Sequence, residues 1–397
     1  ASYQRRLEIL RELGDRTAEY SCLYDLSMLQ SNFQKYQEAL SGFEAALEIA
    51  QALNEESGKA YKIANSQFML GQCYRNLGQQ QEAVSWYEQA VDLYRELNVT
   101  EWSLSGLEYL VNLYRELKQN EQVIASYQRR LEILRELGDR TAEQSCLYQL
   151  ANFQFNGQQY QEALSGFEAA LEIAESLDEG SNRTYKIANS RYMLARCYEK
   201  LEQFHNAIEN YQLSSQLYRE VNDIKWMANA SHYLANIYLY DYPIDKAESI
   251  EQAIRIYQEN VTAYSRETYP KDWAKTQNAL GNAYSKRIRG DKAENLETAI
   301  RHYEASLEIW SHEAYPQDWA MVQVNLGGTY RNRLKGEKLE NWKRAISCYQ
   351  AALEVRTREA EPKNWASLQN RLGNIYSDDV PGDKAENLET AIRYYEA

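Results

Sequence analysis

The chain repeats itself, and a chain that repeats in this way builds its core between neighbouring copies. The segment YQRRLEILRELGDRTAE begins at Tyr3 and again at Tyr127. YQEALSGFEAALEIA begins at Tyr36 and at Tyr160, and both pairs are 124 residues apart. The first part of the chain therefore contains a duplicated block.

The second part repeats with a shorter period. GDKAENLETAIR begins at Gly290 and at Gly382, which are 92 residues apart. A Trp-Ala pair preceded by Asp272, Asp318 or Asn364 recurs every 46 residues. The second part is therefore a 46-residue array.

A smaller unit of two helices lies inside both parts. An apolar residue, a small residue and a tyrosine occur at helical spacing, and a small, an aromatic and a small residue follow on one face of a second helix. Small residues let two helices approach closely, and an aromatic ring fills the next gap. One such unit consists of Leu70, Gly71 and Tyr74 in the first helix and Ala83, Tyr87 and Ala90 in the second.

This pattern resembles the tetratricopeptide repeat family along essentially the whole chain. The resemblance implies an all-α fold, a right-handed α-solenoid of about nine helix-turn-helix repeats. We expect residues 1–19 to be the second helix of a truncated repeat, 20–227 to hold five repeats including the duplicated block, and 228–397 to hold four 46-residue-type repeats, the last truncated. The first helices are expected to begin near Tyr20, Ala64, Leu104, Gln144, Ala188, Ala228, Ala274, Ala320 and Ala366.

Capping residues predict where the helices of the 46-residue array begin. Asp245, Asp291 and Asp383 each precede a glutamate by three residues, as in a capping box. A metal-binding loop is the less favoured interpretation of these acidic segments. Prolines are predicted to stop the preceding helices, so that the next acidic or amide residue caps the following helix; the pairs are Pro270 with Asp272, Pro316 with Asp318, and Pro362 with Asn364.

Both ends look cut, because residues 1–19 match a second helix without its first and the chain stops at Ala397 within a second helix. A solenoid needs polar capping elements at its ends, so we expect a fragment of a longer protein. Arrays with the Tyr-Pro-x-Asp-Trp-Ala and Gly-Asp-Lys-Ala-Glu-Asn signatures are similar to those attached in bacteria, notably cyanobacteria, to caspase-like protease or nucleotide-binding signalling domains. This resemblance implies an attached effector domain outside the fragment.

Charge and composition limit the classes of binding partner that we expect. The formal charge of −14 should repel the phosphate backbone, so nucleic acid is not expected as a partner. No run approaches membrane-spanning length and no signal peptide precedes the first helix, so we expect a cytoplasmic protein that binds no membrane. The five cysteines form no CxxC pair and are expected to be reduced, with the duplicated ones packed in helices.

The sequence contains no pattern that predicts catalysis. The four histidines are scattered, and none lies in an HExxH motif or beside a cysteine at metal-ligand spacing. Phosphate-binding glycine loops and the GxSxG nucleophile motif are missing as well. We therefore expect no enzyme activity, no cofactor and no metal.

Asparagines recur at fixed positions of the predicted first helices. In the family, these helices line the concave groove in which a partner peptide lies. An asparagine amide both donates and accepts hydrogen bonds, so a ladder of them can hold the backbone of an extended peptide. An equally weighted alternative is that they cap or bridge neighbouring helices. The ninth positions are Asn112, Asn152, Asn236, Asn282 and Asn374, and the second positions are Asn65, Asn189 and Asn229.

The same predicted face carries more basic than acidic residues, which reverses the sign of the whole chain and favours an acidic peptide. Rings at fifth positions could form apolar pockets or pack against the next repeat. The basic residues are Arg75, Arg115, Arg196, Lys200, Lys275, Lys286 and Arg331; the acidic ones are Glu108, Glu116, Glu199 and Asp378; the rings are Tyr24, Phe68, Tyr148, Tyr192 and His232.

Two functions fit these features. The first is a non-catalytic scaffold or sensor arm that binds an extended, acidic peptide or partner protein in its groove and regulates an attached effector domain. The second is a structural module that drives self-assembly. Self-assembly predicts a mass that depends on concentration, whereas a binding arm predicts a monomer.

Overall fold

The computed structural model describes residues 2–54, 58–178, 180–242, 245–378 and 383–396. Within these ranges the chain is helical and contains no strand, as predicted. Helices α1 to α9 are Ser2–Leu13, Arg16–Asn32, Tyr36–Ala52, Lys59–Asn76, Gln80–Glu96, Thr100–Glu116, Asn120–Leu137, Arg140–Asn156 and Tyr160–Ser176. Helices α10 to α19 are Ser181–Lys200, Phe204–Glu220, Ile224–Asn236 (continued by the π-helix η1, Ile237–Asp241), Lys246–Ala263, Pro270–Lys286, Lys292–Leu307, Pro316–Arg331, Lys338–Val355, Pro362–Asp378 and Lys384–Glu396.

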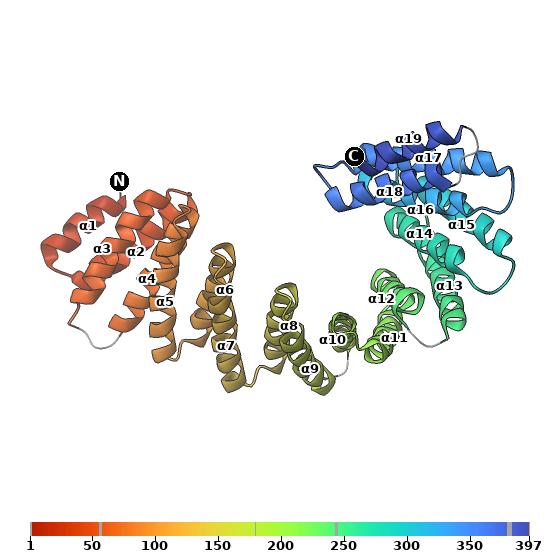
Figure 1. Cartoon of the computed structure of the whole chain (residues 1–397). Helices are drawn as coiled ribbons and strands as arrows, with labels where there is room; N and C mark the ends of the chain where they lie inside the picture. Colours follow the sequence, from red (N-terminus) through yellow and green to blue (C-terminus); the bar gives the residue numbers. More distant parts are fainter. Residues whose placement is uncertain (1, 55–57, 179, 243–244, 379–382, 397) are drawn as a thin grey trace. The chain divides into compact units, whose positions relative to one another are not determined.

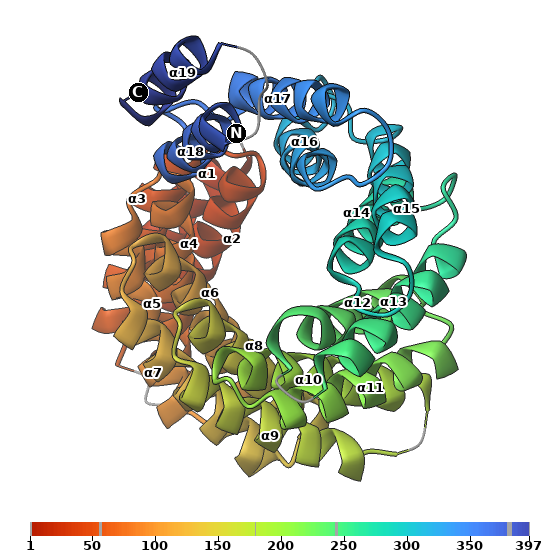
Figure 2. The same ribbon diagram turned by 45° about the vertical axis from the view of Figure 1, so that its right-hand side comes forward.

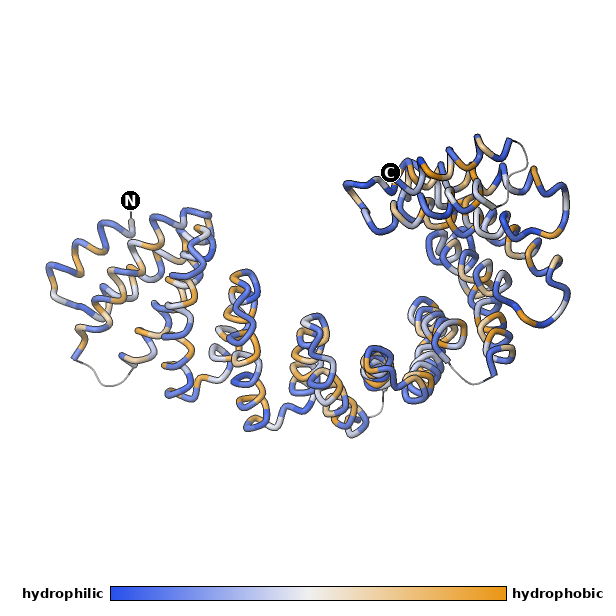
Figure 3. Tube along the Cα trace, in the orientation of Figure 1, coloured by the Kyte–Doolittle hydropathy of each residue, from blue (hydrophilic) through white to orange (hydrophobic). Residues whose placement is uncertain are grey.

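The helices divide into two compact units, residues 1–177 with α1 to α9 and residues 178–397 with α10 to α19 (Figure 1). In each unit taken by itself, consecutive helices pack as pairs, and the even-numbered helices line one face while the odd-numbered helices line the other (Figure 2). Apolar and polar residues are interspersed along the helices (Figure 3), as expected of helices that turn an apolar side to their neighbours. This arrangement confirms the all-α solenoid of helix pairs.

The nine predicted first helices are the even-numbered helices α2 to α18 of the described residues, and α1 is the predicted second helix within 1–19. They begin four to seven residues earlier than expected, because the first turn precedes the first packed residue of each helix. Asp15, Asp139 and Asp223 provide the N-caps of α2, α8 and α12 by accepting a hydrogen bond from the amide three residues later.

The prediction for the prolines of the 46-residue array is wrong. Pro270 and Pro316 are the first residues of α14 and α16, whereas the preceding helices end at Ala263 and Leu307. A proline costs nothing at this position, because its missing N–H would have no partner in the first turn and its φ already suits a helix. Asp272 and Asp318 therefore lie inside the first turn and do not cap the helix.

Pro362 and Asn364 follow the same pattern, since Pro362 is the first residue of α18. The side-chain amide of Asn364 donates a 2.5 Å hydrogen bond to Glu361. Asn364 therefore lies within the helix and is not its cap.

The predicted capping aspartates are confirmed. Asp245 and Asp291 accept hydrogen bonds from the amides of Glu248 and Glu294 at 3.1 and 2.9 Å, and Asp383 accepts one from the amide of Ala385 at 2.8 Å. The stretch from Lys286 to Asn295 is a loop followed by a helix start, as expected.

Small residues and rings make the close contacts between paired helices. A β-carbon built at Gly71 would lie 3.0 Å from the ring of Tyr87, and one built at Gly281 would lie 2.5 Å from the ring of Tyr303. Both rings are almost fully buried. The predicted packing of small against aromatic residues is therefore correct, and it leaves no room for a larger side chain at these glycines.

Two of the 46-residue repeats also carry an ionic contact to the repeat before them. The guanidinium of Arg287 binds both carboxylate oxygens of Glu251 at 2.7 and 2.8 Å and contacts the side chain of Asn295 at 3.4 Å. Arg333 makes the same contacts with Glu297 and Asn341. A two-point arginine–carboxylate pair fixes orientation as well as distance.

Candidate functional site

The eight asparagines of the predicted ladder differ in the partners of their side chains. In six, the amide is hydrogen-bonded to a tyrosine hydroxyl of another helix at 2.5 to 3.1 Å. A tyrosine packed between helices needs such a partner for its hydroxyl. For these six the structure favours the bridging interpretation, and their contact with a peptide stays a prediction. The pairs are Asn65–Tyr94, Asn189–Tyr218, Asn229–Tyr192, Asn236–Tyr257, Asn282–Tyr303 and Asn374–Tyr395.

Asn112 and Asn152 differ from the other six. Within the described ranges neither side chain hydrogen-bonds to another protein atom, and both line one pocket. The ring that packs beside Asn112 belongs to Tyr127, whose hydroxyl accepts a hydrogen bond from Arg115 instead. The residue that occupies the position of Tyr127 in the next repeat is Phe167, which has no hydroxyl. These two amides are therefore available to a ligand.

Four of the seven predicted cations lie over aromatic rings. This contact holds the cation in place without neutralising its charge. Of the other three, Lys200 is exposed, and Arg196 and Arg331 are half-buried. The four cation–ring pairs are Arg75 with Tyr109 at 4.6 Å from the ring centre, Arg115 with Phe153 at 5.3 Å, Lys275 with Tyr233 at 5.3 Å and Lys286 with Tyr240 at 5.5 Å.

The acidic residues of the same face are in contact with other side chains. Glu199 accepts a 2.8 Å hydrogen bond from the hydroxyl of Tyr211, and Glu116 accepts one of 2.6 Å from Gln80. Glu108 lies 3.6 Å from the guanidinium of Arg130. The side chain of Asp378 lies outside the described residues.

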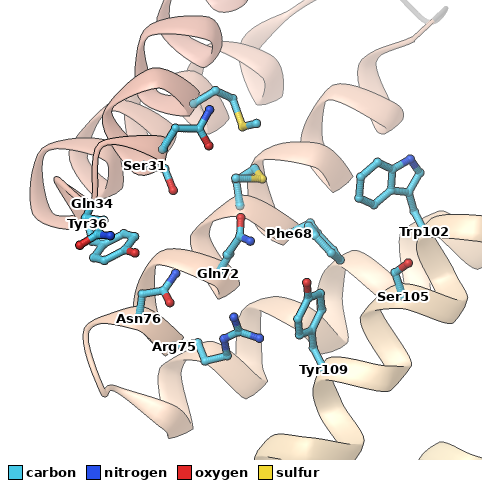
Figure 4. Close-up of a pocket in the computed structure, with 13 residues that line it drawn as sticks. Ser31, Gln34, Tyr36, Phe68, Gln72, Arg75, Asn76, Trp102, Ser105 and Tyr109 are labelled. Atoms are coloured by element: carbon cyan, nitrogen blue, oxygen red, sulfur yellow. The ribbon is translucent and has the colours of Figure 1, made fainter.

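A first pocket of about 590 Å³ opens between the first helices α2, α4 and α6, and we call it the aromatic pocket (Figure 4). Phe68 and Met69 are buried, whereas Trp102 is 40% exposed. The ring of Phe68 contacts that of Trp102 edge to face at 5.2 Å. Arg75 is the one charged residue among the side chains that line this pocket. Its lining includes Met28, Phe68, Met69, Arg75, Trp102 and Tyr109.

A second pocket of about 760 Å³ lies between α6, α7 and α8, and we call it the arginine pocket. It brings together four predicted site residues with Arg130, a cation that the sequence reasoning missed. The hydroxyl of Tyr127 accepts a 2.7 Å hydrogen bond from Arg115. Burial raises the pKa of Tyr127, and Arg115 offsets part of that rise, so the hydroxyl stays neutral. Its lining includes Glu108, Asn112, Arg115, Arg130, Tyr148 and Asn152.

A smaller cavity of about 340 Å³ lies in the second unit, where Gly328 replaces the asparagine of the other 46-residue repeats. Asn282, Lys286 and Arg371 line it, and none of its lining residues is acidic. Excess positive charge therefore occurs at a cavity of each unit.

The predicted rings contribute unequally. Tyr148 is half-buried and lines the arginine pocket, where it contacts the ring of Phe167 at 5.3 Å. Tyr192 is buried, packs against Trp226 at 5.3 Å and accepts a hydrogen bond from Asn229. Tyr192 is therefore a packing residue in this structure, and a peptide contact there stays a prediction.

Sequence reasoning missed Trp102 and Arg130 for two reasons. Trp102 precedes the expected start of its helix at Leu104, although α6 begins at Thr100. Arg130 lies on a second helix, α7, whereas the predicted face consists of first helices alone. Its position in the duplicated segment, with Arg6 as its copy, was the available signal.

The remaining reactive groups are dispersed or buried. All five cysteines are free thiols and four of them are buried, as predicted. Among the described residues, no three or more His, Cys, Asp or Glu side chains gather as a metal site would require. Nor is any helix in the described part of the chain both long and apolar enough to cross a membrane.

The family model of the tetratricopeptide repeat matches residues 19–96 and 143–220. No curated protein sequence matches the chain. One similar solved structure is BtubC (BKLC) from P. vanneervenii, with 20% identity, a TM-score of 0.39 and coverage of 56% of this chain and 90% of that one.

Two other solved structures share more of this chain. The Signal Transduction ATPase with Numerous Domains protein with a tetratricopeptide repeat sensor, from Pyrococcus horikoshii, has 15% identity and a TM-score of 0.47; the match covers 77% of this chain and 44% of that one. The apo form of the quorum sensor NprR from B. thuringiensis has 12% identity and a TM-score of 0.46; the match covers 89% and 94%.

Proposed function

This chain belongs to the tetratricopeptide repeat family, and from that premise we propose that it binds an extended, acidic segment of a partner protein along the first helices α2 to α8. The observation that carries the proposal is the pair of pockets on this face, of about 590 and 760 Å³. Pockets of this size suit groups of a ligand rather than single waters.

Polar groups in the pockets are suited to a peptide backbone. The amides of Asn112 and Asn152 line one pocket, and each can donate to a carbonyl and accept from an N–H. Bonds to the backbone do not depend on the sequence of the peptide. The asparagines therefore supply affinity that many extended segments can use.

The charge of the residues that line the two pockets favours an acidic ligand. Arg75, Arg115 and Arg130 line the two pockets, and Glu108 is the one carboxylate among the lining residues. A local positive potential within a chain of charge −14 attracts acidic segments and repels basic ones. The repeat signatures resemble those of arrays attached to protease or signalling domains. By this resemblance, the chain would recognise the partner on behalf of an effector domain joined to it.

The test uses the protein and fluorescein-labelled 12-residue Ser/Gly peptides that carry four glutamates, four glutamines or four lysines. Anisotropy should show binding in the order glutamate, glutamine, lysine. Replacing both Asn112 and Asn152 by alanine removes about two hydrogen bonds of about 1 kcal/mol each, so affinity should fall roughly thirtyfold for every peptide that binds. Gln161→Ala removes an exposed amide elsewhere in unit 1 and should leave affinity unchanged.

Arg115→Gln should behave differently from the asparagine variants. Its effect on the glutamate peptide should be larger at low than at high salt, because salt screens charge pairs over a Debye length of about 8 Å at physiological ionic strength. Arg5→Gln removes the same charge from α1 and is the matched control. Binding of lysine peptides as tight as that of glutamate peptides, or no binding of any peptide, would overturn the proposal.

A further inference from the structure

We propose that the aromatic and arginine pockets bind one peptide together, with a large apolar side chain in the first and a carboxylate about four residues away in the second. This inference rests on the proposed function and specifies which peptide the same face selects. Both pockets lie in one compact unit and share helix α6, so their separation is determined within that unit.

The aromatic pocket is built for an apolar side chain. One side of its wall consists of the rings of Phe68, Trp102 and Tyr109 with the thioethers of Met28 and Met69, and polar side chains such as those of Gln34, Gln72 and Asn76 line the other side. The Phe68 ring meets Trp102 at 5.2 Å and Tyr109 at 5.8 Å, both edge to face. Figure 4 shows these three rings around one opening, with Arg75 and Asn76 at its edge. An apolar group that covers the exposed part of Trp102 removes apolar area from water.

The arginine pocket is built for a carboxylate. Two guanidiniums, Arg115 and Arg130, face one carboxylate, Glu108, which lies 3.6 Å from Arg130 and is largely exposed. The Nε atom of Arg130 is buried and has no hydrogen-bond partner among the described residues. That buried atom is out of reach of a ligand, but one positive charge of the two arginines is left over. A carboxylate is the ligand group that balances this charge.

The spacing follows from the geometry of α6. Trp102, Ser105 and Tyr109 line the first pocket, and the α6 residues of the second pocket are centred about six positions later, or roughly 9 Å along the axis. The two pockets lie on opposite sides of α6, which adds about one interhelical distance, roughly 10 Å. Because the two separations are perpendicular to each other, the direct distance between the pockets is roughly 13 Å. An extended chain covers this distance in about four residues.

The duplicated block supplies a natural variant of the aromatic pocket. The counterparts of Phe68 and Ser105, 124 residues later, are Tyr192 and Asn229. There the asparagine amide donates a 3.1 Å hydrogen bond to the tyrosine hydroxyl. Exchanging both residues of the first copy for those of the second puts this polar pair into the aromatic pocket. The chain already accommodates the pair once, so the exchange is compatible with the fold.

The first experiment uses the unmodified protein and needs no variant. Acetylated and amidated 14-residue Ser/Gly peptides carry one leucine and one glutamate, placed two, four or eight residues apart and in both orders. The peptide with four-residue spacing should bind at least tenfold more tightly than the others in one of the two orders. Equal affinity at all spacings would overturn the inference but leave the proposed function standing, whereas the failure of every acidic peptide would overturn both.

The second experiment assigns each side chain to its pocket. Phe68→Tyr with Ser105→Asn should lower the affinity of the leucine–glutamate peptide at least tenfold and leave its alanine–glutamate analogue unchanged. Arg130→Gln should weaken the leucine–glutamate peptide and not the leucine–glutamine one. Gln161→Ala, which removes an exposed amide away from both pockets, is the control and should have no effect. Loss of affinity that is the same for every peptide would contradict the assignment.

Discussion

The short repeats from α6 to α11 and the 46-residue repeats from α12 onward use the same residue types for different contacts. In the short repeats, the tyrosine hydroxyl of the second helix contacts a residue near the end of the first helix, as in Tyr127 with Arg115 and Tyr211 with Glu199. In the long repeats it reaches the ninth-position asparagine instead, as in Tyr257 with Asn236.

The loop between the paired helices is the visible difference between the two types. Helices α6 and α7 are separated by residues 117–119, whereas α14 and α15 are separated by residues 287–291. The longer loop of the second pair is held by Arg287, Glu251 and Asn295. The tyrosine is the eighth residue of α7 but the twelfth residue of α15, so its hydroxyl meets a different partner in the two types of repeat. A hydrogen bond from tyrosine to the ninth-position asparagine therefore belongs to the long repeats. In the short repeats the asparagines bonded to tyrosines are Asn65 and Asn189, at second positions, and the ninth-position Asn112 and Asn152 are open to a ligand.

The largest expected effect comes from breaking the close approach in a long repeat. Gly281→Leu would force a side chain into the ring of Tyr303, which lies 2.5 Å from the position of the new β-carbon. We expect a loss of about 3 kcal/mol or more in the free energy of unfolding, measured by urea denaturation. Gly328→Ala is the control, because its β-carbon would lie 3.5 Å from the Tyr349 hydroxyl, an ordinary contact. Equal stability of the two variants would show that the helices are not closely packed at Gly281.

Acid should weaken the second unit, which contains all four histidines. Burial lowers the pKa of His232 to about 3 and that of His302 to about 4, with smaller contributions from Lys275 and Arg301 respectively. The unfolded chain binds these protons near pH 6.5, so the folded state loses stability as the pH falls below that value. From pH 7 to pH 5, His232 alone should cost about 2 kcal/mol.

The pH dependence is measured by hydrogen exchange of each unit between pH 7 and pH 5. The variant His232→Phe should flatten the pH profile of the second unit, because the buried Nδ1 of His232 has no hydrogen-bond partner to lose. A profile identical to that of the unmodified protein would show that His232 titrates normally.

A loss of stability of intermediate size is expected when a hydrogen bond between an asparagine and a tyrosine is removed. Asn282→Ala leaves the buried hydroxyl of Tyr303 without its 2.8 Å partner, and we expect a loss of about 1.5 kcal/mol. Asn112→Ala removes an exposed amide and should change stability by less than about 0.5 kcal/mol. Thermal unfolding of both variants measures the difference. If Asn112→Ala were as damaging as Asn282→Ala, the division between bracing and open asparagines would be wrong.

The smallest expected effect is a gain in stability. Gly328 stands where other long repeats have asparagine, and the hydroxyl of Tyr349 lies 3.5 Å from the position of a new β-carbon. Gly328→Asn should add the hydrogen bond to the hydroxyl of Tyr349 and remove a helical glycine. We therefore expect about 1 kcal/mol of stabilisation in urea denaturation. The double variant with Tyr349→Phe should lose the part that belongs to the hydrogen bond. A destabilised single variant would mean that the brace needs the local geometry of its own repeat.

Much of the fold could be predicted because its signals are local and repeated. Gly281 and Tyr303, or Asp291 and Glu294, recur in copies, and each copy independently supports the same helix pair. Prolines were misplaced, since Pro270 can end one helix or begin the next and only the path of the chain decides between them. Because the predicted helix starts were too late, Trp102 fell outside the predicted face.

The candidate site was predicted less completely, because it depends on partners far apart in the sequence. Asn112 and Asn282 occupy the same position of the repeat, yet one lines a pocket and the other holds Tyr303. Arg130 joins Arg115 in a pocket although it lies on the opposite helix of the pair. Position within a repeat identifies which residues share a helix face, but not which of them already have a hydrogen-bond partner.

The sequence by itself determined the repeat, the helix pairs and the residues at which helices approach closely, because these follow from residue size and spacing within about 50 positions. Tertiary structure alone decided which asparagines brace the solenoid and which face a pocket. A hydrogen bond forms within a few tenths of an ångström of its ideal length, so only the packing of two helices decides which polar groups come within reach of each other. Packing brings the hydroxyl of Tyr303 to Asn282 and leaves Asn112 to a ligand.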